Sequence, residues 1–272
     1  MIEPTMTKNN LGYLAVKGRS QTEELIGTSF AIADPLAEDG MYYLVTCRHV
    51  VQDPLSKGKQ IFLRLNKLDK PGSELTPLKG AWFSHPADRG VDPAGKHAGM
   101  VDLAIFQLPK RPDTPVSFAY LNLEDSLAAQ RSAGGAREGE KIVSAGLFNG
   151  LPGMARNTAV RRSGHIALAG GEALPGVKSW LGAGEYYLSD LRGDGHMAGS
   201  PVYGMRQIGK ESIWALLGVA AGPYPAVRHK NESDRQDDFS LIVPFEKLVD
   251  LIHGEEMAEA RADRRRRNSK AK

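Results

Sequence analysis

The sequence predicts an all-β protein built of two barrel-like halves and ending in a helix. Short runs of strand-like residues recur along the chain, and 30 glycines and 16 prolines supply the turns between them. A stretch rich in Ala, Gly, Ser, Arg and Gln at residues 125–138 lies near the middle of the chain and predicts a linker. Many short strands joined by long turns favour barrels or sandwiches, and two halves of similar length suit two packed barrels.

The first half, residues 10–124, contains six strand-like runs. The second and third flank a loop with Pro, Asp and Gly, and therefore predict a hairpin. Residues 87–99 are rich in Asp, Gly, Pro and His and predict a surface loop. The last run is strongly apolar and contains one acid, Asp102. The six runs are residues 11–16, 27–32, 42–46, 61–65, 82–83 and 101–108.

The second half, residues 139–254, continues the strand pattern and ends in a helix. Pro244 suits the first turn of a helix over residues 245–252, whose apolar residues fall on one stripe. The basic tail that follows, residues 255–272, is compatible with both disorder and helix. The predicted strands are residues 141–147, 161–168, 185–188, 200–204, 213–221 and 239–243.

Composition and charge exclude several classes of function. With 41% apolar and 25% charged residues, the chain has the composition of an ordinary soluble globular protein. The tail carries seven basic and four acidic residues, which accounts for the whole net charge of +3. A near-neutral body argues against a nucleic-acid partner. The longest apolar run, residues 213–222, is too short to span a bilayer, so no membrane partner is expected.

The single cysteine, Cys47, excludes an intrachain disulfide. Residues 1–10 lack the apolar core of a secretory signal. Both features predict a soluble, cytoplasmic protein from a reducing compartment. A mature form already stripped of its signal would have the same sequence, so this alternative stays open.

Two segments carry residues that a serine-peptidase site requires. Such a site needs a hydroxyl that attacks, an imidazole that takes its proton, a carboxylate that orients the imidazole, and N–H groups that receive the oxyanion. His49 follows a strand in V-T-C-R-H-V-V, and Asp102 precedes apolar residues in V-D-L-A-I. A carboxylate between apolar neighbours is expected to be partly buried and to need a partner, which an imidazole can supply.

A third segment, residues 195–201, has the sequence G-H-M-A-G-S-P. It resembles the nucleophile loop G-x-S-G-G-P or G-x-S-G-S-P of trypsin-like serine peptidases, and the chain is most similar to their bacterial HtrA-like members. The segments around His49 and Asp102 resemble the family patterns V-T-A-x-H-V-V and D-L-A-I/V-L, and residues 146–166 and 241–245 resemble two further strands. The resemblance spans residues 27–252. It implies a chymotrypsin-like fold, which is a double six-stranded antiparallel β-barrel with a C-terminal helix and a site between the barrels.

The resemblance implies a role for each of the three positions. His49 would be the general base and then acid, Asp102 the orienting carboxylate, and residue 198 the nucleophile. Position 198 holds alanine, which has no nucleophile. Ser200 does not replace it, because moving two residues along a tight loop re-aims the side chain. An engineered serine-to-alanine change in an active peptidase is one explanation, which the intact His49 and Asp102 favour, and a natural pseudoprotease is the other.

The resemblance also implies an oxyanion hole, formed by the N–H groups of His196 and Ala198. The family usually has glycine where His196 stands, and a positive φ is costly for any other residue. This loop is therefore expected to rest in a flipped conformation until a partner or substrate binds.

Two segments match positions that contact the substrate in the family. Arg192 could bind an acidic substrate side chain, whereas Asp190 or Asp194 could bind a basic one. The strand expected to pair with the substrate backbone consists of Val219, Ala220, Ala221 and Gly222.

No cofactor and no metal are expected. A group of acids and histidines in and beside the predicted surface loop matches no standard zinc spacing; its members are His85, Asp88, Asp92 and His97. Cys47 is predicted to be a small buried residue rather than a second nucleophile.

The residues and the resemblance together predict a trypsin-like serine endopeptidase, bacterial and cytoplasmic, that carries out limited proteolysis of an intracellular protein partner. The chain as given is expected to be inactive because position 198 is alanine. A protein or peptide is the expected substrate, and a protein activator or cascade partner would restrain such an enzyme inside a cell. The alternative is a pseudoprotease that binds an extended peptide along residues 219–222. A nucleic-acid binder that uses the basic tail is a poorer third possibility.

Overall fold

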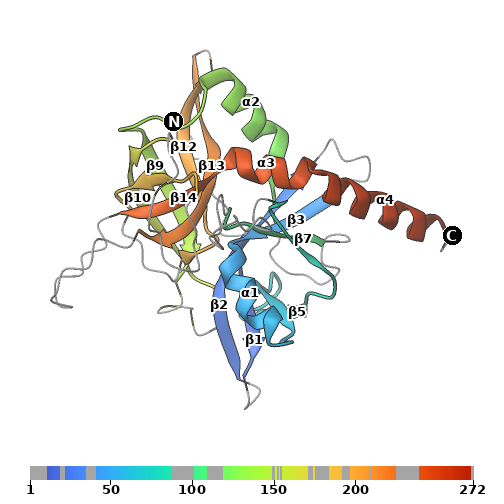
Figure 1. Cartoon of the computed structure of the whole chain (residues 1–272). Helices are drawn as coiled ribbons and strands as arrows, with labels where there is room; N and C mark the ends of the chain where they lie inside the picture. Colours follow the sequence, from blue (N-terminus) through green and yellow to red (C-terminus); the bar gives the residue numbers. More distant parts are fainter. Residues whose placement is uncertain are drawn as a thin grey trace, which may run out of the picture.

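The computed structural model describes residues 11–18, 22–34, 41–86, 101–108, 119–148, 151, 153, 155–170, 174, 184–191, 197–208, 210–224 and 239–270. Strands fill most of both halves, and helices lie beside them and at the C-terminus (Figure 1). The predicted all-β fold with a C-terminal helix is confirmed. The predicted surface loop at residues 87–99 lies outside the described residues.

The first half forms one sheet of eight strands rather than the predicted closed barrel of six. Its hydrogen-bonded order is β5-β4-β1-β2-β3-β7-β6, and β8 pairs with β2 in parallel. The two ends of this order, β5 and β6, are joined by residues 78–81 alone, so the sheet curls back on itself. No ladder between the described strands closes it, and Pro77 at the end of β5 lacks the N–H that a further ladder would use. The strands are β1 (Leu11–Lys17), β2 (Glu23–Asp34), β3 (Met41–Thr46), β4 (Ile61–Asn66), β5 (Ser73–Pro77), β6 (Trp82–Ser84), β7 (Ala104–Leu108) and β8 (Leu121–Asn122).

The second half is a closed barrel of six antiparallel strands. Its order is β10-β11-β14-β13-β12-β9, and β9 pairs with β10 to close it. Each of the six predicted runs of this half overlaps a strand, the run at residues 141–147 coincides with β9, and the run at residues 185–188 begins two residues before β11. The strands are β9 (Lys141–Leu147), β10 (Ala159–Leu168), β11 (Tyr187–Ser189), β12 (Pro201–Ile208), β13 (Glu211–Pro223) and β14 (Ser240–Pro244).

One apolar core runs through both halves, with Phe30 of β2 and Leu147 of β9 among its members. The hydroxyl of Tyr13 in β1 donates to the carbonyl of Phe148, with an O–O distance of 2.8 Å. Burial raises the pKa of Tyr13 to about 12, although the charge of Arg64 opposes this, so the hydroxyl keeps its proton. The halves therefore form one packed unit.

The predicted linker at residues 125–138 is mostly helix. Helix α2 (Leu123–Ala133) begins at Asn122, whose side-chain oxygen accepts a hydrogen bond from the N–H of Glu124 at 3.0 Å. Gln130 Nε2 donates to the carbonyl of Leu216 in β13 at 3.3 Å. Small and polar residues predict a linker, but Ala and Leu favour a helix once a cap and a packing surface are present.

The basic tail is also a helix, and it packs on the first sheet. Helix α3 (Phe245–His253) covers the second half, and helix α4 (Glu255–Lys270) follows it. Arg261 Nη1 donates to the hydroxyl of Tyr43 at 3.2 Å, and Arg264 Nη1 donates to the carbonyl of Leu108 at 3.2 Å. Arg261 and Arg264 therefore anchor helix α4 to strands β3 and β7.

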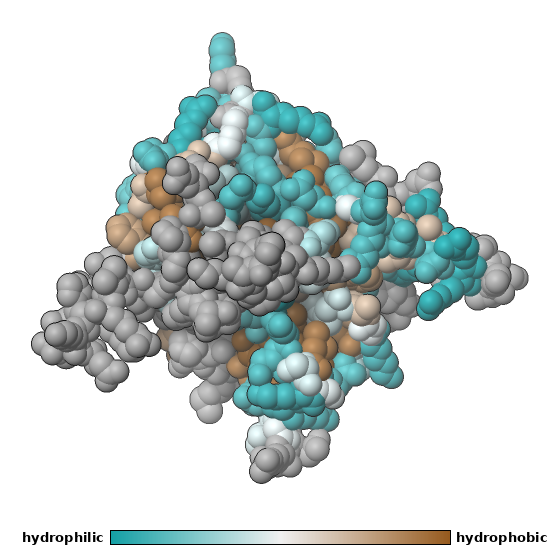
Figure 2. All heavy atoms as spheres, in the orientation of Figure 1, coloured by the Kyte–Doolittle hydropathy of each residue, from teal (hydrophilic) through white to brown (hydrophobic). Residues whose placement is uncertain are grey.

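The outer end of α4 is hydrophilic, as the right side of Figure 2 shows, and Arg265, Arg266 and Arg267 are exposed there. Within the described part of the chain, no helix combines the length and the apolar character that crossing a membrane would require.

A buried ion pair joins β12 to the residue before β9. Arg206 Nη1 lies 2.8 Å from Glu140 Oε2, and the two side chains are 3% and 10% exposed. Removing one partner leaves an uncompensated buried charge, which costs roughly 3–5 kcal/mol. We predict that Arg206→Met lowers the free energy of unfolding by about this amount, measured by urea titration. The double variant Arg206→Met with Glu140→Leu should recover most of the loss, and a single variant as stable as the parent would contradict the prediction.

Candidate active site

His49 lies in the first turn of helix α1 (Arg48–Ser56), which begins directly after strand β3. Cys47, the residue before the helix, has extended backbone angles of φ −76° and ψ 143°. Val50 and Val51 are buried and hold the helix against the core. The side chain of His49 is 25% exposed, so a rigid element carries an imidazole that substrate can reach.

Asp102 faces His49 from the segment that leads into strand β7. Its side chain is 3% exposed, and its neighbours Val101 and Leu103 are buried. Asp102 Oδ1 accepts the backbone N–H of His49 at 2.9 Å, and Oδ2 lies 2.7 Å from His49 Nδ1. The carboxylate favours the tautomer with the proton on Nδ1, so Nε2 is the nitrogen left to accept a proton from a nucleophile.

Ala198 lies in a loop that binds both halves of the protein. Its carbonyl accepts the N–H of Thr28 in β2 at 3.0 Å, and the N–H of Gly199 donates to the carbonyl of Ala220 in β13 at 2.9 Å. The thiol of Cys47 donates to the same carbonyl of Ala220 at 3.2 Å. Cys47, two residues before His49, and Gly199, one residue after Ala198, therefore contact the same carbonyl oxygen, that of Ala220.

The described hydroxyl and thiol groups near His49 are buried and do not offer a nucleophile to a substrate. Ser200 is 0% exposed, and a Cβ on Gly146 would collide with its Oγ, so the side chain points into the second half. Thr46 Oγ1 donates to the carbonyl of Thr28 at 2.7 Å. Burial, followed by the charge of Asp102, raises the pKa of Cys47 well above its usual value, so this thiol stays protonated.

Arg192, Asp194 and His196 lie outside the described residues, so their predicted roles stay predictions. The structure describes Asp190, and its carboxylate contacts another residue of the same chain, His165. Asp190 Oδ1 accepts the backbone N–H of His165 at 2.5 Å, and Oδ2 lies 3.2 Å from His165 Nδ1.

The predicted substrate strand belongs to β13. Two of its four residues, Val219 and Ala220, already have partners on both edges of the strand. Val219 pairs with β12 on one side and β14 on the other. The N–H and carbonyl of Ala220 bind residues 200 and 199 of the loop. Pairing with β14 continues past Gly222, whereas no described residue binds the opposite edge beyond Ala220. Ala221 and Gly222 therefore have no partner on that edge among the described residues, and the substrate role of all four residues stays a prediction.

Cys47, His49 and Asp102 place three potential metal ligands within 4.8 Å of one another. Ligands on one tetrahedral zinc ion, with bonds of about 2.0–2.2 Å, would lie roughly 3.3 Å apart. His49 Nδ1 and Asp102 Oδ2 are closer than this, at 2.7 Å, which is a hydrogen-bond distance. The geometry therefore favours a hydrogen-bonded pair over a zinc site.

The predicted loop cluster of acids and histidines is described only at His85. Burial lowers the pKa of this imidazole, while the charges of Asp250 and Lys247 act in opposite directions. Asp88, Asp92 and His97 lie outside the described residues.

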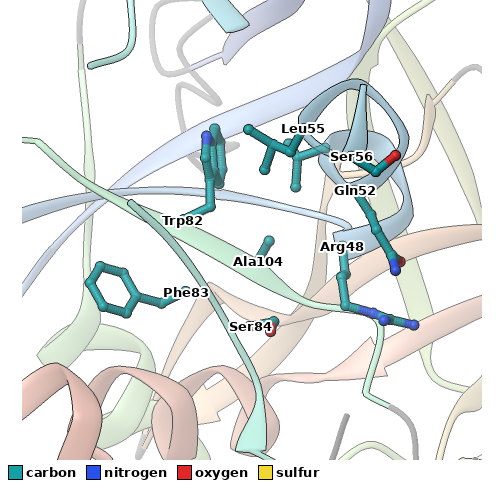
Figure 3. Close-up of a pocket in the computed structure, with 9 residues that line it drawn as sticks. Arg48, Gln52, Leu55, Ser56, Trp82, Phe83, Ser84 and Ala104 are labelled. Atoms are coloured by element: carbon teal, nitrogen blue, oxygen red, sulfur yellow. The ribbon is translucent and has the colours of Figure 1, made fainter. Parts of the chain in front are cut away.

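A pocket of about 290 Å³ lies between α1 and the β6–β7 pair, next to the helix turn that carries His49. In Figure 3, Trp82 and Leu55 lie at one end of it and Arg48 and Gln52 at the other. Sequence analysis did not predict this pocket, because its residues come from segments far apart in the chain. A half-exposed Trp82 beside the outward Leu55 is the signal that was available.

Thr28 was also missed as a site residue. Sequence analysis placed it only in a strand, yet it is 0% exposed and binds the carbonyl of Ala198. A pair of hydroxyl residues, Thr28 and Ser29, within an otherwise apolar buried run was the signal for it.

No protein-family model matches the chain, and no curated protein matches its sequence. Among solved structures, the chain is similar to the MamO protease domain from Magnetospirillum magneticum in its apo form. The TM-score is 0.54 at 14% identity, over 89% of this chain and 94% of that one. Human heparin binding protein gives a TM-score of 0.50 at 14% identity, over 91% of each chain. This likeness shows the fold, which is chymotrypsin-like as the resemblance implied.

Gly199 shows how little space the loop leaves. Its φ is +87°, and a Cβ there would collide with the carbonyl of Thr28 and with Thr46 Oγ1. Gly134 has a similar φ of +76°, but a Cβ there would meet no atom of the described residues within 4 Å, so Gly134→Ala measures backbone strain alone. We predict that Gly199→Ala costs about 1–3 kcal/mol more than Gly134→Ala in urea unfolding, because overpacking adds to the strain. Equal losses in the two variants would mean that the loop relaxes freely.

Proposed function

We propose that this chain is a trypsin-like serine endopeptidase with alanine at the nucleophile position, and that it is inactive in this form. The observation that carries the proposal is the two-point contact between Asp102 and His49, with one carboxylate oxygen on the backbone N–H and the other 2.7 Å from Nδ1. A buried carboxylate that fixes the ring in this way is the arrangement that activates a serine hydroxyl.

The loop around Ala198 supplies a second requirement of a serine peptidase, an N–H group for the oxyanion. The carbonyl groups of residues 197, 198 and 200 and the N–H of Gly199 are bound, whereas the N–H of Ala198 has no partner among the described residues. An unpaired N–H at this position can receive the oxyanion that develops on a scissile carbonyl. A serine at position 198 would place a hydroxyl on the same residue, with His49 Nε2 to accept its proton. His196 is proposed as the second donor.

The proposed substrate is a protein segment in extended conformation. Ala221 and Gly222 offer it a strand edge, and Arg192 is proposed to contact its side chain. We propose limited cleavage of one intracellular protein, since a single cysteine suits a reducing compartment.

A natural pseudoprotease that binds peptides without cutting them is the second candidate. The observation that favours it is the burial of Ser200 and Cys47, which leaves no substitute nucleophile near His49 among the described residues. A chain with this sequence would hold a peptide along the same edge and release it intact.

The test is the pair formed by the parent chain and Ala198→Ser. Each is mixed with a fluorophosphonate probe, and then with a peptide library. We predict labelling and cleavage only in the serine variant, because loss of the nucleophile typically costs on the order of a millionfold in turnover. The cleaved peptides would also report the preferred side chains.

The matched control is Ala198→Ser combined with His49→Ala, which should label and cleave far more slowly if His49 is the general base. If the folded serine variant neither labels nor cleaves, the endopeptidase proposal is wrong for this scaffold. Binding of library peptides to the parent chain would then support the pseudoprotease.

A further inference from the structure

Cys47 lies where the two halves of the site meet. It precedes His49 by two residues, is 0% exposed and is a free thiol. Its sulfur reaches the carbonyl of Ala220 in the second half at 3.2 Å. The same sulfur, a ring nitrogen of His49 and a carboxylate oxygen of Asp102 lie within 4.8 Å of one another.

Two acceptors compete for the single proton of this thiol. The carbonyl of Ala220 already accepts the N–H of Gly199 at 2.9 Å. Asp102 carries a full negative charge in a site that is 2% exposed, and its hydrogen bonds to the backbone and to the ring both come from His49. A carboxylate has about four acceptor positions, and a charged acceptor forms the stronger bond.

The thiol stays available as a donor. Burial raises the pKa of Cys47 most, the charge of Asp102 raises it further, and a hydrogen bond from the backbone of Gly199 acts in the opposite direction. A protonated thiol within 4.8 Å of a buried carboxylate is close enough for its proton to turn toward that charge.

We propose that Cys47 is a positioning residue of this site, whose S–H donates to the Asp102 carboxylate and keeps it aligned with His49 Nδ1. The carbonyl of Ala220 is the alternative acceptor, so the same thiol connects the His–Asp pair to the strand that binds the 198 loop. The effect on catalysis rests on the proposed function, whereas the contact with Asp102 is independent of it.

The test uses the full chain with Ala198 in place and three variants at position 47. Cys47→Ser keeps a donor, Cys47→Ala removes it, and Cys47→Val removes it while filling the space. The readout is the proton on His49 Nδ1, followed by its NMR resonance and by its rate of exchange with water. We expect the resonance to move and the exchange to accelerate in the Ala and Val variants, and both to stay near the parent values in the Ser variant.

A packing role alone would give a different pattern. In that case the Ser variant would be perturbed as much as the Ala variant, or none of the three would change the Nδ1 proton, and either result would overturn the proposal. Thermal unfolding of each variant separates loss of the fold from loss of the contact. If the Val variant does not fold, the comparison of the Ser and Ala variants still tests whether position 47 must donate a hydrogen bond.

A second arm repeats the series in the Ala198→Ser background. Cys47→Ala should lower kcat/KM about tenfold through kcat, and Cys47→Ser should restore it, as expected for loss of one hydrogen bond to a charged group. Absence of activity in the Ala198→Ser chain, together with the NMR pattern expected above, would refute the proposed function and leave the role of Cys47 at Asp102 intact.

Discussion

The hydrogen bonds of Thr28 hold the site together, because every polar group of this buried residue is used to join a different segment. Its N–H binds the carbonyl of Ala198, and its carbonyl accepts from Thr46 Oγ1 three residues before His49. Its hydroxyl exchanges two hydrogen bonds with Leu147 of the second half, at 3.2 and 3.1 Å. One residue of the first sheet thus fixes the nucleophile loop, the strand that leads to His49 and the wall of the barrel. A buried polar group left unpaired costs about 1–3 kcal/mol, so these contacts are made together or not at all.

Two His–Asp pairs among the described residues have the same contacts and different environments. In each, one carboxylate oxygen binds the backbone N–H of the histidine and the other lies near Nδ1. The side chains of His165 and Asp190 are 57% and 49% exposed, whereas that of Asp102 is 3% exposed. Water screens the exposed pair, which therefore contributes little to the orientation of the His165 ring. Because Asp102 is buried and Asp190 is not, the contact with Asp102 orients its histidine ring more firmly than the contact with Asp190 does.

Sequence patterns predicted the strands better than the helices, for identifiable reasons. Residues 141–147 are mostly apolar, and all but Lys141 are buried in β9, so their pattern and their environment agree. The strand β5 has a mostly polar sequence, S-E-L-T-P, and no fully buried residue, so no pattern marks it. The arginines of α4 predict a solvated tail by charge alone, but Arg261 and Arg264 bind groups of the first sheet. Such contacts depend on tertiary structure, which no local pattern contains.

The same limit applies to the candidate site. His49, Asp102 and the 198 loop could be predicted because each lies in a short motif that resembles a known family. Thr28, Cys47 and the pocket beside Trp82 could not, because their roles depend on partners between 18 and 173 residues away, such as Thr46 and Ala220. A local pattern can mark such a residue as unusual, as the Thr28–Ser29 pair does, but it does not show which distant segment the residue joins.

The intact His49 and Asp102 have a physical explanation that does not require activity. Asp102 is an acid buried beside the apolar residues Val101 and Leu103, and loss of the imidazole would remove one of its two hydrogen bonds from His49. Folding therefore retains these residues whether or not the site cuts peptides. Position 198 differs, because its carbonyl holds Thr28 while its side chain makes no polar contact that the fold needs. In the proposed peptidase, residue 198 is thus the one member of the site whose side chain the fold does not require.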